Sequence, residues 1–355
     1  MTNTFFETLK TFIKSMILVF VLVSIANLFI ELLLATRTYL LLDHNNILKK
    51  IKITEDTDLL FIEQHSKDIF IGNSKTSFSL STGVKRDFSD ALSFNGSSDG
   101  RRITNSKLLT NKKHYGVLLG SSQSWGYFVK DEETLSHQIM KKIDTIALDN
   151  YSLLGLTLEQ SFQYLQAVKQ NLNKKDFLLV VGGVADVVNY CSLDYLDYNL
   201  RTTQMSSNIG LINFYYKLKK RFNLTLNNRV CEKKEDANIV VEKILNSIEL
   251  FIHYADKNNL EILIVIPPVT LYGTPNLTEL NPNNNFYELQ KNYSLVYELL
   301  DSRLKNLNSP KIVNLMHTFN ESEQFYIDLD SHFNKKGHEK IAKEIIKNMP
   351  TNLLD

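Results

Sequence analysis

From residue 113 onward, short apolar runs alternate with longer amphipathic segments, and few folds accommodate such an alternation. The runs are apolar on successive residues, as in strands that are covered on both faces. The segments between them repeat apolar residues every three or four positions, as amphipathic helices do. The expected strands are residues 115–119, 145–148, 177–182, 261–268 and 311–315, and the expected helices are residues 133–142, 157–172, 238–255, 286–304 and 337–349. The pattern predicts a three-layer α/β/α fold, with a mostly parallel five-stranded sheet between two layers of helices.

The chain divides into three expected parts. Residues 1–36 are a cytoplasmic tail and membrane anchor, residues 37–112 are a linker or extension, and residues 113–355 are the α/β domain. Within the α/β domain, residues 190–236 break the alternation and are too long for an ordinary connection. We therefore expect an insertion there, over one end of the sheet, which forms either a lid or a packed extension.

The N-terminal run of residues 15–35, SMILVFVLVSIANLFIELLLA, is almost entirely apolar. Its length is close to the roughly 20 residues that a membrane-spanning helix needs, and only Asn27 and Glu31 are strongly polar. No small-residue cleavage site follows, so we expect an uncleaved anchor, with a buried core helix as the alternative. Basic residues lie on both sides of the run, so charge alone leaves its orientation open.

Charge and cysteine content bear on the expected partners. The formal net charge is +1, so nothing in the charge balance indicates a nucleic-acid partner. Cys191 and Cys231 do not have the spacing of metal ligands, and no metal site is expected. The two cysteines flank a polar, aromatic segment. They pair if this part of the chain lies in an oxidising compartment, and are two unpaired thiols otherwise.

Small hydroxyl, glycine, aspartate and histidine residues gather where the expected strands end. In an open parallel sheet, ligands bind beyond the carboxyl ends of the strands. The run GSSQSWG follows the first strand, and DLDSHFNKKGH follows the fifth. A serine hydroxyl becomes nucleophilic when a histidine takes its proton and a carboxylate orients that histidine. Ser122 and His332 can supply the first two parts, and Asp328 or Asp330 can supply the third.

The order of these residues resembles the conserved blocks of the SGNH (GDSL-type) hydrolases. The first block of that family reads Gly-Asp-Ser-x-Thr-x-Gly, and Gly120–Gly126 matches it in spacing. Ser122 falls at the position of the nucleophile, with Ser121 in place of the aspartate and Ser124 in place of the threonine. Gly155 matches the glycine of the second block.

The third and fourth blocks depart from the family pattern. The third is Gly-x-Asn-Asp, and here Ala185, followed by Asp186, stands where the family has an asparagine that donates to the oxyanion. The fourth is Asp-x-x-His, in which His332 is matched but Leu329 occupies the position of the aspartate. Asp328 lies four residues before the histidine and Asp330 lies two before it. A helical turn would favour Asp328 and an extended segment Asp330, so the sequence leaves the choice open.

The resemblance covers about residues 113–349 and implies the flavodoxin-like fold and serine chemistry of this family. It implies that Ser122 attacks an ester, that His332 takes the proton, and that backbone N–H groups of Ser122 and Gly155 form the oxyanion hole. No metal or organic cofactor is implied. The expected protein is a membrane-anchored esterase or O-acyltransferase outside the cytoplasm, acting on an ester such as an acetyl group of a cell-envelope glycan. Because Ala185 cannot donate, a catalytically degenerate protein that binds or scaffolds in envelope polysaccharide assembly is the alternative.

Overall fold

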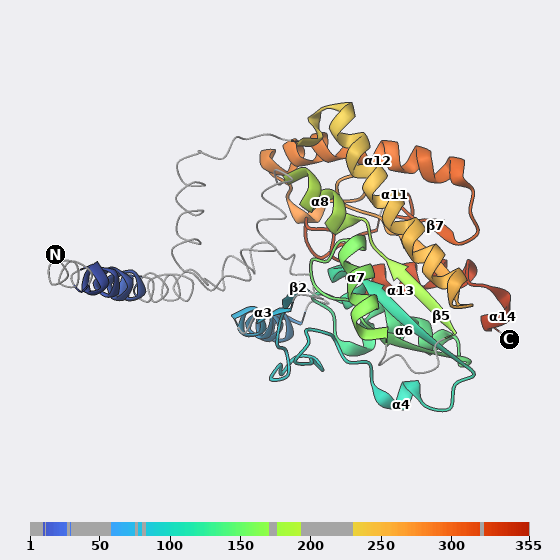
Figure 1. The fold of residues 1–355 in the computed structure, drawn as a ribbon. Helices are drawn as coiled ribbons and strands as arrows, with labels where there is room; N and C mark the ends of the chain where they lie inside the picture. Colours follow the sequence, from blue (N-terminus) through green and yellow to red (C-terminus); the bar gives the residue numbers. More distant parts are fainter. Residues whose placement is uncertain are drawn as a thin grey trace.

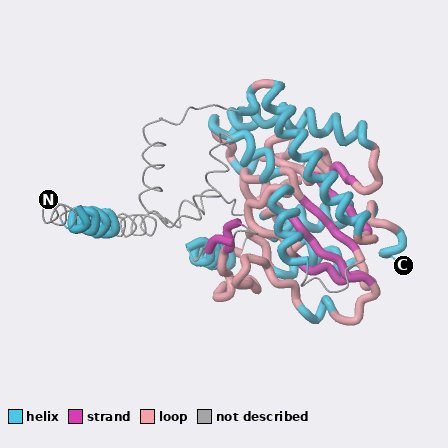
Figure 2. The backbone as a smooth tube through the Cα atoms, viewed as in Figure 1, coloured by secondary structure: helices cyan, strands magenta, loops and turns pink. Residues whose placement is uncertain are grey.

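The computed structural model describes most of the α/β region and part of the chain that precedes it. The described residues are 10, 12–26, 29, 58–74, 77–79, 83–169, 176–192, 230–319 and 323–354. Figure 1 and Figure 2 show strands surrounded by helices in the region that begins at residue 114.

Five parallel strands form the central sheet. They are β3 (His114–Gly120), β4 (Ile146–Asn150), β5 (Phe177–Val181), β6 (Glu261–Ile266) and β7 (Ile312–Asn314), in the spatial order β4-β3-β5-β6-β7. Every neighbouring pair is parallel, which confirms the predicted sheet. β5 is buried along its whole length, and this is why its sequence is apolar on every residue instead of alternating.

Helices cover both faces of the sheet. One face packs against α7 (Leu158–Val168), α8 (Val184–Ser192), α11 (Lys234–Lys257) and α12 (Asn284–Leu307), and the other against α6 (Leu135–Lys142), α13 (Lys335–Lys347) and α14 (Thr351–Leu354). Side chains of a strand alternate between faces, so Leu178 belongs to the first core and Leu179 to the second. The three-layer α/β prediction is thereby confirmed.

The carboxyl ends of the parallel strands lie at one edge of the sheet. β3 has β4 on one side and β5 on the other, so the chain crosses from one side of β3 to its opposite side. The crevice at such a switch point is where open α/β sheets bind ligands. The segment that contains Ser122 follows β3 directly and therefore lies at this point.

The described residues between 58 and 112 pack against the α/β domain. They include α3 (Leu59–Ser74), the antiparallel pair of β1 (Ser77–Ser79) and β2 (Gly83–Lys85), and α4 (Ser106–Leu109). Ile69, Phe88 and Phe94 form a buried cluster with Trp125 of the α/β domain. The sequence predicted a linker or extension here, because this part of the chain is mixed and polar in composition. We call the described residues 58–74, 77–79 and 83–112 the extension below.

The described part of the N-terminal apolar run, residues 15–26 and 29, is helical with exposed side chains; Phe20 is 72% exposed. Among the residues that the structure describes, no helix has both the length and the apolar character that crossing a membrane requires. The rest of the predicted span, residues 27–28 and 30–35, lies outside the described residues. Most of the predicted insertion, residues 193–229, also lies outside them. The anchor and the insertion stay predictions.

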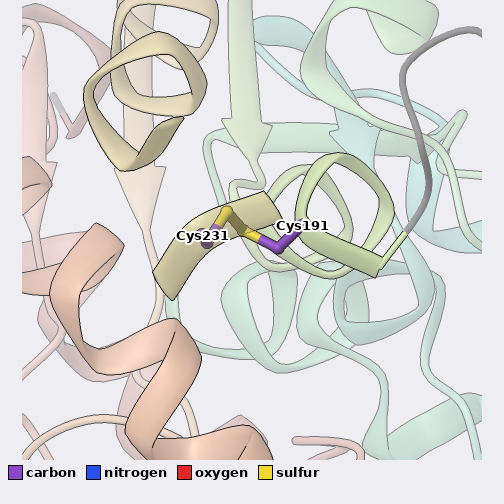
Figure 3. The surroundings of a disulfide bond; sticks show 2 residues. All are labelled: Cys191 and Cys231. Atoms are coloured by element: carbon purple, nitrogen blue, oxygen red, sulfur yellow. A yellow bond between two sulfur atoms is a disulfide. The ribbon is translucent and has the colours of Figure 1, made fainter. Parts of the chain in front are cut away.

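Cys191 and Cys231 form a disulfide bond, shown in Figure 3. Their Cα atoms are 5.2 Å apart, and they lie 40 positions apart along the chain. Cys191 lies near the end of α8, and Cys231 lies in a short 3-10 helix (Val230–Glu232) before α11. Both are buried in the first core. Of the two alternatives that the sequence left open, the structure has the bonded pair.

Replacing both cysteines with alanine will lower the free energy of unfolding by roughly 3–4 kcal/mol, because the bond constrains a long loop of the unfolded chain. Denaturant unfolding of the wild type and of the double variant, each with and without a reductant, measures the effect of the bond. The reductant should leave the double variant unchanged, which makes that variant the control. Equal unfolding midpoints for the wild type under both conditions would contradict the prediction.

Candidate active site

Ser122 is presented by a sharp turn between β3 and the short helix α5 (Ser122–Trp125). Gly120 ends the strand with φ 149°, and a Cβ at this position would lie 2.0 Å from the carbonyl oxygen of Val181. Only glycine fits such a close approach to a neighbouring strand. Ser121 then takes the N-cap position of α5 in an extended conformation, without a side-chain capping hydrogen bond. Ser122 is the first helical residue, so its backbone N–H has no acceptor in a preceding turn.

His332 is fixed by a tight turn in the loop between β7 and α13. Tyr326 and Phe333 pair as an antiparallel bridge, and the backbone N–H of Ile327 donates to the carbonyl of His332 at 2.9 Å. Ser331, at the turn, has φ 71°, which is the left-handed region. The side chain of Asn334 caps α13 by accepting from the backbone N–H of Gly337 at 2.9 Å. The chain on both sides of His332 is therefore held by hydrogen bonds.

The structure brings Ser122, His332 and Asp328 into one hydrogen-bonded line. Nε2 of His332 lies 2.9 Å from Oγ of Ser122, and Nδ1 lies 2.6 Å from Oδ2 of Asp328. The other carboxylate oxygen of Asp328 accepts from the backbone N–H groups of Asp330 and His332, at 3.0 and 3.1 Å. Asp328 is 5% exposed, whereas Asp330 is exposed. Both ring nitrogens of His332 are engaged by other residues, so the structure does not bring Asp330 onto the imidazole.

The surroundings of His332 set the strength of this base. Burial of the imidazole works against its charged form, but the carboxylate of Asp328 and the charge of Asp330 outweigh burial, and the pKa of His332 is raised above its ordinary value. The ring of Tyr127 lies beside the imidazole, with centroids 4.5 Å apart. A raised pKa makes His332 a stronger base and favours the imidazolium that forms when it takes a proton.

Gly155, the second residue of the expected oxyanion hole, lies in the loop after β4. It has φ 74°, it is exposed, and no atom lies within 4 Å of the place where a Cβ would be. The structure thus leaves open space beside this backbone. The neighbouring carbonyl of Leu154 accepts from Nη1 of Arg86 at 2.6 Å, and this bond fixes the peptide that precedes Gly155.

The residues at the third block hold the site together from α8. Asp186 is fully buried, and its carboxylate accepts from the backbone N–H of Leu158 at 3.0 and 3.1 Å, at the start of α7. Burial raises the pKa of Asp186 to about 7, although the backbone donors work against this shift. Ala185 has no side-chain donor. Asn189, one turn later on α8, places Nδ2 3.4 Å from the carbonyl oxygen of Gly155.

Sequence reasoning missed several residues that shape the site. Gln123 is 2% exposed, and its Nε2 donates to the carbonyl of Ser331 at 2.8 Å, which ties the turn of Ser122 to the turn of His332. Its position directly after Ser122, the candidate nucleophile, was an available signal. Asn189 could have been found as the amide four residues after Ala185 on the same helix. Within the described ranges, no group of three or more His, Cys, Asp or Glu residues is arranged to hold a metal ion.

No family model matches the chain, and no curated protein matches it in sequence. Solved structures with a similar arrangement include a member of the lipolytic protein G-D-S-L family from Veillonella parvula, with 12% identity, a TM-score of 0.40, and coverage of 66% of this chain and 97% of that chain. The psychrotrophic esterase EstA from a Pseudoalteromonas species has 16% identity, a TM-score of 0.39, and coverage of 68% and 100%. A carbohydrate acetylesterase family member from Sinorhizobium meliloti has 12% identity, a TM-score of 0.39, and coverage of 66% and 97%. At these identities and TM-scores, we draw no functional conclusion from the similarity.

Proposed function

We propose that the chain is an SGNH-type serine esterase or O-acyltransferase. The observation that carries this proposal is the line from Ser122 through His332 to Asp328, with distances of 2.9 and 2.6 Å. A serine, a histidine and a carboxylate in hydrogen-bond contact can form and break an acyl-serine ester. Their position at the carboxyl ends of the strands is where an open α/β sheet accepts a ligand.

The first half of the proposed reaction transfers an acyl group to the protein. Oγ of Ser122 attacks the carbonyl carbon of the ester, and its proton passes to Nε2 of His332. The Asp328 carboxylate stabilises the imidazolium through Nδ1–H. Backbone N–H groups of Ser122 and Gly155 stabilise the negative oxygen of the tetrahedral intermediate. When the intermediate collapses, the carbon–oxygen bond to the alcohol breaks, and His332 returns the proton to that alcohol.

The second half of the reaction regenerates Ser122. His332, neutral again, takes a proton from water or from a second alcohol, whose oxygen attacks the acyl-serine carbonyl. Water gives hydrolysis and a free acid, whereas a sugar hydroxyl gives a new ester and therefore acyl transfer. Collapse of the second tetrahedral intermediate releases Ser122, which recovers its proton from His332.

We propose an ester of a cell-envelope glycan, such as an acetyl ester, as the substrate, and a location outside the cytoplasm on a single membrane anchor. The disulfide between Cys191 and Cys231 supports an oxidising compartment. The apolar run of residues 15–35 supports the anchor, since its length matches a membrane-spanning helix. Resistance of the full chain to extraction from membranes by alkaline carbonate tests the anchor, and release by carbonate alone would exclude it.

The second candidate is a non-catalytic protein of the same fold that binds or scaffolds in envelope polysaccharide assembly. Ala185 favours it, because the position lacks the side-chain donor that the resemblance leads one to expect. One oxyanion donor is worth about 10²–10³ in kcat in other enzymes. Loss of a single donor therefore slows such an enzyme without removing the remaining catalytic groups.

Covalent labelling with a serine-directed phosphonate separates the two candidates. An active serine will displace the leaving group of the phosphonate and give one adduct per chain, at Ser122, because His332 activates this hydroxyl alone. Intact mass gives the stoichiometry and peptide mass locates the adduct. The variant His332→Asn, which lacks the base, is the control and should label far more slowly. A wild-type protein that stays unlabelled would favour the binding role.

A further inference from the structure

Arg102 of the extension holds both ends of the loop that follows the Ser122 helix. Its guanidinium is 2% exposed. Nη1 donates to the carbonyl of Gly126, Nη2 donates to the carbonyl of Val129 at 2.6 Å, and Nε pairs with Asp131 at 2.6 Å. A buried guanidinium with several well-placed acceptors fixes the backbone groups that it reaches. Residues 126–129, the clamped loop, are therefore held from the extension.

His65 of α3 holds the middle of the clamped loop. Its Nε2 accepts from the backbone N–H of Phe128 at 3.2 Å, and its Nδ1 lies 3.3 Å from Oγ of Ser93, which donates to Asp68 at 2.7 Å. The imidazole is fully buried, and burial keeps its pKa well below the ordinary value, so the ring is neutral with the proton on Nδ1. Phe128 has φ 63°, an uncommon conformation for a bulky residue that persists where the surroundings impose it.

The clamped loop positions a side chain against the base of the site. Tyr127 lies between the two carbonyls that Arg102 holds, and next to the N–H that His65 holds. Its ring is 4.5 Å from the ring of His332 and 4.1 Å from that of Phe128, measured between centroids. Through the backbone of this loop, the extension therefore positions the aromatic ring that packs beside the imidazole of His332.

Two further contacts of the extension reach the other parts of the site. Nη1 of Arg86 donates to the carbonyl of Leu154 at 2.6 Å, directly before Gly155. Nε1 of Trp125, which lies on the same short helix as Ser122, donates to the carbonyl of Gly100 at 3.0 Å. Trp125 is fully buried and is the only tryptophan of the chain. It packs on Phe94 at 4.9 Å between ring centroids, so its fluorescence reports on the contact between the extension and the Ser122 helix.

We propose that the extension is a positioning module of the active site, in which His65, Arg86 and Arg102 hold the backbone that carries Tyr127 and Gly155. This inference rests on the proposed serine chemistry. All three side chains end on backbone groups of loops that contact the site, which distinguishes them from residues that only stabilise the extension. Lys67 is the contrast, because its ammonium pairs with Glu63 on the same helix of the extension, at 2.7 Å.

Substitutions of His65 and Arg86 in the full chain test the proposal. His65→Phe keeps an aromatic ring among its aromatic neighbours but removes the acceptor of the Phe128 N–H, and His65→Gln restores an acceptor oxygen. Arg86→Gln replaces the guanidinium, which donates to the carbonyl of Leu154, with the amide of a shorter side chain. Lys67→Gln and His114→Gln are controls, the first within α3 and the second at the amino end of β3, away from the site. The measurements are kcat and KM on an acyl ester, the rate of phosphonate labelling, and the emission maximum of Trp125.

The expected result is a fall of about 10- to 100-fold in kcat and in labelling rate for His65→Phe and Arg86→Gln, since small misplacements of catalytic groups have effects of this size. KM should change little. His65→Gln should recover most of the labelling rate, and both controls should resemble the wild type. Emission from Trp125 should shift to longer wavelength in His65→Phe alone, because this change loosens α3 beside the indole.

The outcomes separate this inference from the proposed function. Wild-type labelling with equal rates in His65→Phe and Arg86→Gln would overturn the positioning role and leave the serine chemistry in place. A wild type that does not label would overturn the serine chemistry and, with it, this inference. Should His65→Phe fail to fold, Arg86→Gln decides, because Arg86 is only partly buried. Full kcat in folded Arg86→Gln would then overturn the proposal.

Discussion

Replacing Ser122 with alanine will reduce ester turnover by at least about 10⁴-fold, as removal of the nucleophile does in other serine hydrolases. Oγ of Ser122 is hydrogen-bonded to Nε2 of His332 at 2.9 Å, so alanine removes the atom that attacks and leaves the base without a proton to take. The thermal unfolding midpoint should move little, because a single hydrogen bond at a partly exposed side chain contributes only about 1 kcal/mol. Initial rates on an acyl ester and a thermal melt check both parts.

The neighbouring serines provide the controls for this prediction. Ser121 is 2% exposed and takes the N-cap position of the short helix without a side-chain capping hydrogen bond, and Oγ of Ser124, which is fully buried, donates to the carbonyl of Ser121 at 3.0 Å. Ser121→Ala and Ser124→Ala should therefore act on stability more than on turnover. If Ser121→Ala were inactive and Ser122→Ala were active, the assignment of the nucleophile would be off by one residue.

The sheet was readable from the sequence because its strands are covered on both faces. β5 is the clearest case: Phe177–Val181 is apolar on every residue, and the structure buries every one of them. The expected range 311–315 corresponds to the shorter strand Ile312–Asn314, whose end residues are only partly buried. Strand ends are set by neighbouring strands and loops more than by local sequence, so such differences are expected.

The pairing of Ser122 with His332 was also readable, because both follow strands of one parallel sheet. The sequence did not decide which carboxylate, Asp328 or Asp330, orients the imidazole. The choice depends on the turn between Ile327 and His332, in which Ser331 adopts a left-handed conformation with φ 71°. That turn is neither the extended nor the helical segment that spacing arguments consider. It folds the chain back so that Asp328 reaches the imidazole across it.

The role of the extension could not be predicted from the sequence, for a different physical reason. Its contacts with the site come from single polar residues, His65, Arg86 and Arg102, each far from the others in sequence. Charged and polar residues in a segment of mixed, polar composition predict a solvated surface. Here their partners on the loops that contact the site are backbone groups, which are the same at every position of a sequence. No spacing rule can therefore identify them.

Asp328→Asn will lower turnover by about 10⁴-fold, as loss of the carboxylate does in a serine triad, whereas Asp330→Asn will have a mild effect. Asp328 contacts Nδ1 of His332 at 2.6 Å and holds the backbone of the turn. Asparagine keeps the size of the side chain but can present its amide to Nδ1, which favours the wrong tautomer. Asp330 is exposed and acts on His332 through its charge. Parallel measurements of kcat for the two variants separate these roles.

The pH dependence gives an independent check on the same pair. Burial lowers the pKa of His332, but the negative charges of Asp328 and Asp330 raise it by more than burial lowers it, so the net shift is upward. His332 must be neutral to accept the Ser122 proton, so kcat/KM should fall as the pH drops through a pKa above the ordinary value of about 6.5. Asp330→Asn removes one raising charge, and its acid limb should move to lower pH with the plateau almost unchanged. A large loss of plateau activity in Asp330→Asn, with normal activity in Asp328→Asn, would assign the carboxylate role to Asp330 instead.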